Sequence, residues 1–330
     1  MFKRTTLFAI ALALVAASCS SSDVAGTTST SEPATTTFST TSTSTTTTLP
    51  PDDGFPVTVE AANGAVTIDA RPERIVSISP TSTEVLFAIG AGEQVIAVDS
   101  LSNYPPEAPI TELSAWTPSI EAIAEYDPDL VFISFDPGDL IVGLETLGIP
   151  VILHGTASSL EDAYAQWEQT GAATGHIAEA VDVVSDTQSR LLDAAESIAN
   201  EAQGLTYYYE IEDLLYTTTS ASFIGQVIAL TGLSNIADEA ADPDGFGYPQ
   251  LSQEFIVESD PNLILLANTV YGGQSLETVA ARPGWGSISA VTSGAVVELN
   301  DDIASRWSPR VVELLDAVVE AVSSLPTADA

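Results

Sequence analysis

Two segments of the chain share one plan, and this repeat constrains the fold more than any other feature of the sequence. The first reads S-I-E-A-I and continues to D-P-D-L-V; the second reads S-Q-E-F-I and continues to D-P-N-L-I. Glu254 follows Glu121 by 133 positions, and Asp260 follows Asp127 by the same distance. Solenoid repeats recur every 20–50 residues or so. So long a period predicts two similar lobes instead.

Strand and helix patterns alternate within the first lobe. Asp129–Phe135 is a nearly continuous apolar run, which is typical of a strand buried on both faces. Other short apolar runs predict strands at Arg74–Ser79, Gln94–Val98 and Pro150–Leu153. An amphipathic helix is predicted at Ser82–Ala91, and another helix, which ends before Gly148, at Leu140–Leu147. Such alternation indicates βαβ units and parallel sheets, so the expected fold class is α/β.

A long helix is predicted between the two lobes, over residues 176–203. Its apolar residues recur at three- and four-residue spacing, including Ile177, Val181, Val184 and Leu191. A helix of that length spans roughly 40 Å. The expected organisation is therefore an N-terminal lobe over 55–175, this linker helix, and a C-terminal lobe over 204–330. A rigid spine of this kind would limit lobe motion to slight rocking.

The first 54 residues have the composition of an export signal and a tether. Residues 1–18 combine Lys3 and Arg4 with an apolar run that is too short to span a bilayer. Cys19, the only cysteine, ends a motif, A-A-S-C, that resembles the lipobox of bacterial lipoproteins and implies lipidation there. Residues 19–54 are rich in Ser and Thr and read as a flexible tether. The alternative is an uncleaved anchor, or an ordinary signal with an incidental cysteine.

Charge and missing motifs exclude several functions. The formal net charge of −38 disfavours nucleic acid and anionic lipid surfaces as partners. The sequence has no Walker loop and no G-x-S-x-G elbow, and Gly90-Ala-Gly92 reads as a helix C-cap. His154 and His176 read as surface or capping residues, since two histidines cannot supply a bare-metal site. We therefore expect no enzyme, no metal ligands and no cofactor in the protein itself.

A family resemblance runs through residues 71–320. The run R-P-E-R-I-V-S-I-S-P-T-S-T-E-V-L-F-A-I-G-A-G, from Arg71 to Gly92, resembles the opening of the cobalamin and ferric-siderophore family of periplasmic substrate-binding proteins. Further matching motifs are Tyr104-Pro-Pro-Glu-Ala, Tyr126-Asp-Pro-Asp-Leu-Val, Tyr248-Pro-Gln-Leu-Ser, Arg282-Pro-Gly-Trp and Ser308-Pro-Arg. The resemblance implies two Rossmann-like lobes joined by a single long helix, with a ligand cleft between the lobes.

The resemblance also implies a transport role and two partners. The chain would be the substrate-binding component of an ABC importer, lipid-anchored on the extracytoplasmic face of the membrane. It would deliver its ligand to a membrane permease with a cytoplasmic ATPase. Family members carry one glutamate per lobe that meets an arginine of the permease, and here these would be Glu121 and Glu254. The alternative is that both are first-turn acids that complement helix dipoles, worth about 0.3–1 kcal/mol each.

The expected ligand site combines aromatic and polar side chains. Ligands bind beyond the carboxyl ends of strands in open α/β sheets. Aromatic residues near predicted strand ends are Tyr104, Trp116, Phe135, Tyr216, Tyr248 and Trp307, with core packing as the alternative role; Trp167 and Trp285 look structural. In the family, the loop that contains Asp302 and Arg306 faces the cleft, and a cobalamin binder places an aspartate at the position of Asp302. A solvated turn is the alternative for that loop.

The expected ligand is a neutral or weakly charged metal chelate, either cobalamin or a ferric siderophore, whose own metal is cobalt or iron. Arg306 is the one basic residue that can be placed near the cleft, and a strongly anionic chelate needs several cationic donors. Two other functions remain open at this point. One is a surface sensor or adhesin that keeps the binding fold, and the other is a lipid-anchored α/β enzyme.

Overall fold

The computed structural model describes residues 54–240, 245 and 247–325. The predicted signal peptide, Cys19 and the tether up to residue 53 lie outside the described residues. Within the described part of the chain, no helix is both long enough and apolar enough to cross a bilayer.

Four parallel strands form the sheet of the N-terminal half, in the order β4-β3-β5-β6. They are β3 (Ile75–Ile78), β4 (Val95–Val98), β5 (Leu130–Ile133) and β6 (Val151–Leu153). Each lies inside a predicted strand, which confirms those predictions. Alternate residues of β5 enter different cores. Leu130 and Phe132 belong to the core that contains residues of α1 (Pro80–Ala88) and α4 (Leu160–Thr174). Val131 and Ile133 belong to the core that contains residues of α2 (Ile120–Ala124) and α3 (Leu140–Thr146).

The sheet of the C-terminal half repeats the same topology. Its strands are β7 (Thr206–Glu210), β8 (Ser234–Asn235), β9 (Leu263–Leu266) and β10 (Val296–Glu298), in the parallel order β8-β7-β9-β10. Its helices are α6 (Phe223–Ala229), α7 (Gln253–Ser259), α8 (Leu276–Ala280), α9 (Ser289–Ser293), α10 (Asp301–Ser305) and α11 (Val311–Ser323). The two sheets therefore correspond strand for strand, as the sequence repeat predicts.

The repeat extends to individual hydrogen bonds. In the first half, the carboxylate of Asp129 accepts from the backbone N–H groups of Glu73 and Arg74, just before β3. Asn262, 133 positions later, accepts from the backbone N–H of Thr206 at the start of β7. The same two segments also join through the backbone, Asp129 N–H to Arg74 C=O and Asn262 N–H to Thr206 C=O, each at 3.0 Å. The same local hydrogen-bond arrangement, which we call the clasp, thus occurs at the beginning of a central strand in both sheets.

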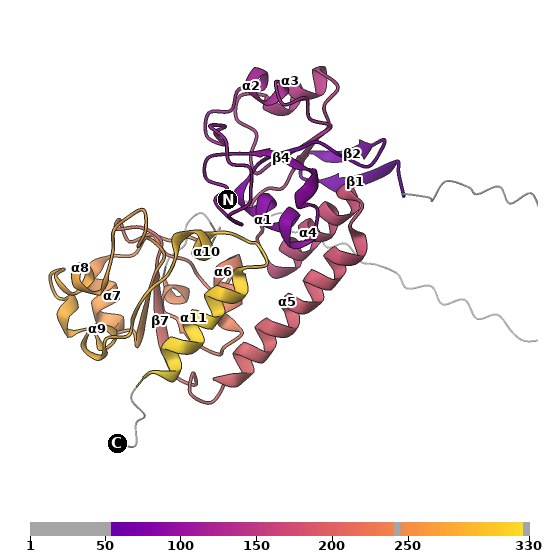
Figure 1. Cartoon of the computed structure of the whole chain (residues 1–330). Helices are drawn as coiled ribbons and strands as arrows, with labels where there is room; N and C mark the ends of the chain where they lie inside the picture. The colour runs from indigo at the N-terminus through magenta and orange to yellow at the C-terminus, as the bar shows by residue number, and fades with distance from the viewer. Residues whose placement is uncertain (1–53, 241–244, 246, 326–330) are drawn as a thin grey trace, which may run out of the picture. The chain divides into compact units, whose positions relative to one another are not determined.

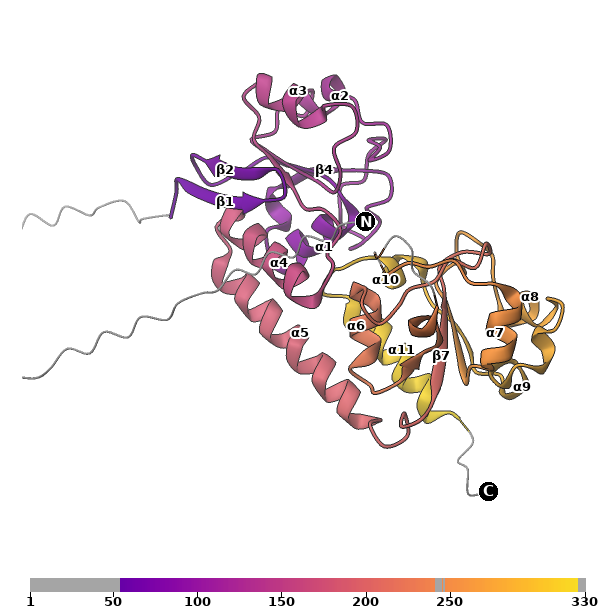
Figure 2. The same cartoon turned by 180° about the vertical axis from the view of Figure 1, so that it is seen from behind.

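Helix α5 (Ile177–Ser197) follows the first sheet and precedes the second in the chain (Figures 1 and 2). The predicted helix, to residue 203, is too long, because residues 198–204 form turns. Ile198 and Ala202 are buried, so the apolar spacing continues although the backbone changes to i→i−3 hydrogen bonds at Ile198. Helices α4 and α5 cross closely at Gly171, where an added Cβ would lie 2.5 Å from that of Ala180.

Helix α1 is not amphipathic in the way that the sequence predicts. It begins at Pro80, with Ser79 as its N-cap, and its polar residues Thr81, Ser82, Thr83 and Glu84 are buried along with its apolar ones. Its polar face therefore packs against protein. The predicted C-cap is confirmed, because Gly90 has a φ of +83° and donates to Phe87 C=O, while Ala91 N–H donates to Leu86 C=O.

A hairpin outside the predicted elements precedes the first sheet. Its strands, β1 (Val57–Ala61) and β2 (Gly64–Ile68), are antiparallel, and β1 packs on α4. The side chain of Asn63, at the turn, donates to Val151 C=O and accepts from Leu153 N–H. The hairpin thereby covers the edge of β6.

Candidate ligand-binding site

A cavity of about 240 Å³ lies at the carboxyl ends of strands from both sheets. From the N-terminal half it is lined by Ser79, Pro80, Thr81, Leu101 and Ser134. From the C-terminal half it is lined by Tyr271, Asp302, Ser305, Arg306 and Trp307. Ser79, Ser134 and Tyr271 follow β3, β5 and β9 respectively. This is where ligands bind in open α/β sheets, so we call it the cleft cavity.

Larger hollows lie elsewhere on the molecule. One of about 590 Å³ is lined by the ends of α11 and α9 and by Asn262, and one of about 630 Å³ is lined by residues 67–71, 127–129 and 145–150. Both lie at the amino ends of strands, where residues such as Asp129 hold the sheet together. Position in the fold therefore favours the smaller cleft cavity as the ligand site.

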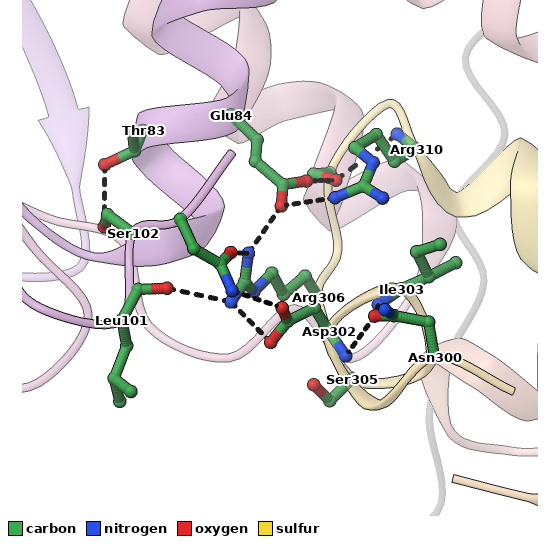
Figure 3. A network of polar contacts seen from close by, with 12 residues as sticks. Thr83, Glu84, Leu101, Ser102, Asn300, Asp302, Ile303, Ser305, Arg306 and Arg310 are labelled. Atoms are coloured by element: carbon green, nitrogen blue, oxygen red, sulfur yellow. Dashed lines mark hydrogen bonds and ion pairs between the residues drawn. The ribbon is translucent and has the colours of Figure 1, made fainter. Parts of the chain in front are cut away.

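Arg306 lines the cleft cavity and lies at the centre of a network of polar contacts (Figure 3). It is only 7% exposed. Its Nη1 lies 2.7 Å from Glu84 Oε1 and 3.1 Å from Asn103 Oδ1. Its Nη2 lies 2.6 Å from Asp302 Oδ1 and 3.0 Å from Leu101 C=O. The guanidinium is thus occupied by protein acceptors.

Glu84 accepts hydrogen bonds from three residues of the C-terminal half. It is 3% exposed and, besides Arg306, binds Arg310 Nη1 at 3.2 Å and accepts a short hydrogen bond from Ser308 Oγ (Figure 3). Glu84 belongs to α1, whereas its three partners follow α10. We call Glu84, Asp302, Arg306 and Arg310 the interlobe network. Its two carboxylates and two guanidinium groups balance in charge.

The predicted aromatic residues fall into separate groups. Trp307 lines the cleft cavity, with its indole N–H donating to Gln166 Oε1 at 2.7 Å. Trp116 and Phe135 pack against each other at 5.4 Å between ring centroids. They are 71% and 36% exposed, and Phe135 directly follows the cavity residue Ser134.

Three predicted tyrosines do not line the cleft cavity. Tyr104 lies under the guanidinium of Arg310, 3.9 Å from ring centroid to Cζ, and lines a separate cavity of about 320 Å³. Tyr216 and Tyr248 are partly exposed on the C-terminal half, and burial raises the pKa of Tyr248. The prediction placed Tyr104 at the ligand because it lies near a strand end, but the ring turns toward α11.

Tyr271 and the hydroxyl groups of the cavity are not among the site residues predicted from the sequence. Tyr271 is 64% exposed and its hydroxyl lies 3.3 Å from Asp302 Oδ1. Asp302 also accepts from Asn103 Nδ2 at 2.7 Å. The strand-end rule that selected Phe135 after β5 would have selected Tyr271 after β9. The loop before it carries no motif that marks it.

Glu121 and Glu254 have equivalent positions. Each lies in the first turn of its helix, α2 or α7, two residues after the N-cap serine, and each side chain is exposed. Ser119 Oγ donates to Glu121 Oε2 at 3.1 Å. Among the described residues, neither carboxylate forms an ion pair.

The histidines and tryptophans were predicted with mixed success. Trp167 and Trp285 are buried, as expected for structural residues, and His176 is the N-cap residue of α5. His154 is buried rather than a surface or capping residue. It packs on Phe132, and burial lowers its pKa to about 4. The described residues contain no cluster of three or more His, Cys, Asp or Glu that could hold a metal ion.

Comparisons with known proteins agree with this arrangement. A family model described as periplasmic binding protein matches residues 75–303. An uncharacterised ABC transporter substrate-binding lipoprotein of Bacillus subtilis is 28% identical, over 81% of this chain and 86% of its own. A cobalamin-binding protein of Halobacterium salinarum is 29% identical, over 81% and 74%. The crystal structure of the periplasmic vitamin B12 binding protein of Vibrio cholerae covers 76% of this chain and 96% of its own, at 26% identity and a TM-score of 0.59.

Proposed function

Because the chain belongs to the periplasmic binding protein family, we propose that its cleft cavity captures a neutral metal chelate of the corrinoid class for an ABC importer. Family membership confirms two predictions, the two-lobe α/β class and a binding protein rather than an enzyme. It also implies an extracytoplasmic location, a small-molecule ligand and a permease with its ATPase as partners. The choice of ligand, the lipid anchor and the docking residues are our proposals.

The occupied state of Arg306 is the observation that carries the choice of ligand. It is the one Lys or Arg among the described residues that line the cleft cavity, and two carboxylates already neutralise it. Moving a multiply charged anion from water into such a cavity leaves its charge without a cationic partner. Catecholate and citrate siderophores loaded with iron, and haem with its propionates, therefore fit poorly.

The remaining lining suits contact with one edge of a large neutral ring system, because a cavity of about 240 Å³ is too small to enclose the whole ring. Ser79, Thr81 and Ser134 provide hydroxyl groups, and Trp307 and Tyr271 provide aromatic surface. Trp116 and Phe135 present further aromatic surface next to Ser134. Rigid aromatic side chains bind flat apolar surfaces at low cost in conformational entropy. The names of the Halobacterium and Vibrio proteins support a corrinoid over a neutral hydroxamate siderophore.

Calorimetric titration of the purified protein tests the ligand class. We expect tight binding of cyanocobalamin, weaker binding of ferrioxamine and no binding of ferric enterobactin. Trp116→Ala should weaken cyanocobalamin binding by about tenfold, because removing a contacting aromatic ring costs roughly 1–2 kcal/mol. Val142→Ala, which truncates another exposed apolar side chain on α3, is the control. Tight, selective binding of ferric enterobactin would overturn the charge argument.

The proposed permease-docking role of Glu121 and Glu254 predicts a transport defect without a binding defect. Alanine at either position should reduce uptake and leave the ligand Kd unchanged, because rim charges mainly govern association with the partner. Glu125→Ala and Glu258→Ala are matched controls. These exposed glutamates are also related by 133 positions and lie at the opposite ends of α2 and α7. Normal uptake by both docking variants would leave the two acids as helix-terminal charges. A loss of uptake would also argue against a sensor or adhesin.

The proposed lipid anchor at Cys19 has its own test. Cys19→Ala should abolish incorporation of radiolabelled palmitate and release the protein from membranes. Cys19→Ser, which keeps a polar side chain of similar size, should do the same. Equal labelling of the wild type and both variants would reject the lipobox interpretation.

A further inference from the structure

The loop after β9 holds Tyr271 in a fixed position at the cleft cavity. The carboxylate of Asp301 accepts from three successive backbone N–H groups, those of Thr269 at 2.8 Å, Val270 at 2.8 Å and Tyr271 at 2.9 Å. Asp301 is itself buried. Hydrogen bonds to an ionised acceptor are roughly twice as strong as neutral ones. Although Val270 and Tyr271 have exposed side chains, their backbone is therefore held in place.

The hydroxyl group of Tyr271 has a defined polarity. It lies 3.3 Å from Asp302 Oδ1, which can only accept, so the phenol donates its one proton there. Asp302 is held in turn by Arg306 at 2.6 Å and by Asn103 at 2.7 Å. Burial and the nearby Asp302 raise the pKa of Tyr271, so the phenol stays neutral. What remains for a ligand is the lone pairs of its oxygen, which accept hydrogen bonds.

We propose that Tyr271 is a specificity-determining residue that selects chelates with N–H donors at their periphery, and that Asp301 is the residue that positions it. The inference rests on the proposed function, since it names the part of a corrinoid that this cavity recognises. The primary amides around a corrin ring are such donors. A ligand with only acceptor groups at the same place would face the phenol oxygen and Asp302 without a hydrogen bond, which is unfavourable for both sides.

Two probes that share the same corrin ring distinguish the effect of hydrogen bonding from the effect of binding the ring. Dicyanocobinamide carries amide side chains, whereas the heptamethyl ester of dicyanocobyrinic acid carries neutral esters that cannot donate. Calorimetry gives the Kd of each probe, and their ratio is the measure of selectivity. Tyr271→Phe should lower this selectivity by about 3- to 10-fold, the worth of one hydrogen bond. Tyr126→Phe, which removes a hydroxyl outside the cleft cavity, should leave the ratio unchanged.

Asp301→Asn tests the positioning role. The amide keeps the size of the side chain, but one of its two acceptor atoms becomes a donor facing backbone N–H groups. We expect the same fall in selectivity as in Tyr271→Phe, and no further fall in the double variant, because Asp301 acts through Tyr271. A general loss of stability would change both Kd values together and leave their ratio intact.

The outcomes distinguish the inference from the function beneath it. Unchanged selectivity in Tyr271→Phe, with cobinamide still bound, would overturn the inference and leave the corrinoid function standing. Failure of the wild-type protein to bind either probe would overturn both. An additive effect in the double variant would remove Asp301 from the proposal and keep Tyr271.

Discussion

Glu84 shows how one buried side chain can link distant parts of the chain. Its carboxylate binds two arginines and a serine that lie 222 to 226 positions later. A buried charge is tolerated only when it is paired and hydrogen-bonded. Among the described residues, loss of this one carboxylate therefore leaves Glu313, which is partly exposed, as the one ion-pair partner of Arg310, and Asp302 as the one ion-pair partner of Arg306.

Glu84→Gln should destabilise the protein by about 3 kcal/mol, since removing one partner of a buried ion pair leaves an uncompensated charge. Urea unfolding at neutral pH measures the change in the free energy of unfolding. The exposed Glu73→Gln is the control and should change that free energy by less than about 0.5 kcal/mol. A loss below 1 kcal/mol in Glu84→Gln would place the pair among weak surface ion pairs.

His154 predicts a specific dependence of stability on pH. Burial lowers its pKa from 6.5 to about 4, so protons bind more strongly to the unfolded chain between these values. The stability that the neutral ring confers is complete above about pH 6.5 and is lost as the pH falls toward 4. The free energy of unfolding falls by about 3 kcal/mol across this pH window. Urea unfolding at several pH values should show a shallower slope in this window for His154→Gln than for the wild type. An identical slope would exclude His154 as a source.

At this scale the sequence predicts residue types better than their partners. The family resemblance predicts Asp302 at the cleft and nearness to a strand end predicts Trp307 there, and both residues line the cavity. The saturation of Arg306 could not be predicted, because its partner Glu84 sits in what reads as the polar face of an amphipathic helix. Tyr104 lies outside the lining of the cleft cavity, and its contact with Arg310 could not be predicted because only the fold brings Arg310 over its ring.

Among the elements, the two sheets are the most predictable part of the molecule. Each strand of the first sheet is an apolar run between turn residues, and the observed limits differ from the predicted ones by two residues or fewer. The end of α5 was not predictable from spacing, because Ile198 and Ala202 stay buried after the helix ends. Hairpin β1–β2 has the weaker alternating pattern of a two-stranded element, so no strand was assigned there.

The clasp that occurs in both halves predicts how substitutions of Asp129 change the stability of the protein. Asp129→Ala should destabilise the protein by about 2 kcal/mol, because two N–H groups before β3 lose their acceptor. Asp129→Asn should cost less than half as much, since Asn262 performs the same task in the second sheet with one amide oxygen. Thermal unfolding compares the variants. Equal losses for alanine and asparagine would mean that the carboxylate charge, rather than the acceptor geometry, matters.

At the scale of the whole molecule, both the interlobe network and α5 restrict the movement of one half relative to the other. The network joins α1 to the segment after α10, whereas α5 continues the chain from one half to the other. Two connections restrict relative movement more than one does. We therefore expect the cleft cavity to exist before the ligand arrives, with little closure on binding.

Distances between spin labels test this expectation. Labels at the exposed positions Val142 on α3 and Thr292 on α9 should give the same mean distance with and without cyanocobalamin, within a few ångströms. Glu84→Gln should broaden the distance distribution, because it removes the central acceptor of the network. A large shortening on ligand addition in the wild type would show closure instead.

The division of charge in the interlobe network limits how the two halves can be recombined. The N-terminal half contributes Glu84, and the C-terminal half contributes both arginines with Asp302. A chimaera that joins this N-terminal half to the C-terminal half of a relative keeps the buried carboxylate of Glu84 but loses the two arginines that neutralise it. It will fold well only where the donor half brings matching guanidinium groups. Grafting new ligand specificity by exchanging whole lobes should therefore begin with residues 84, 302, 306 and 310, before any residue that faces the ligand is changed.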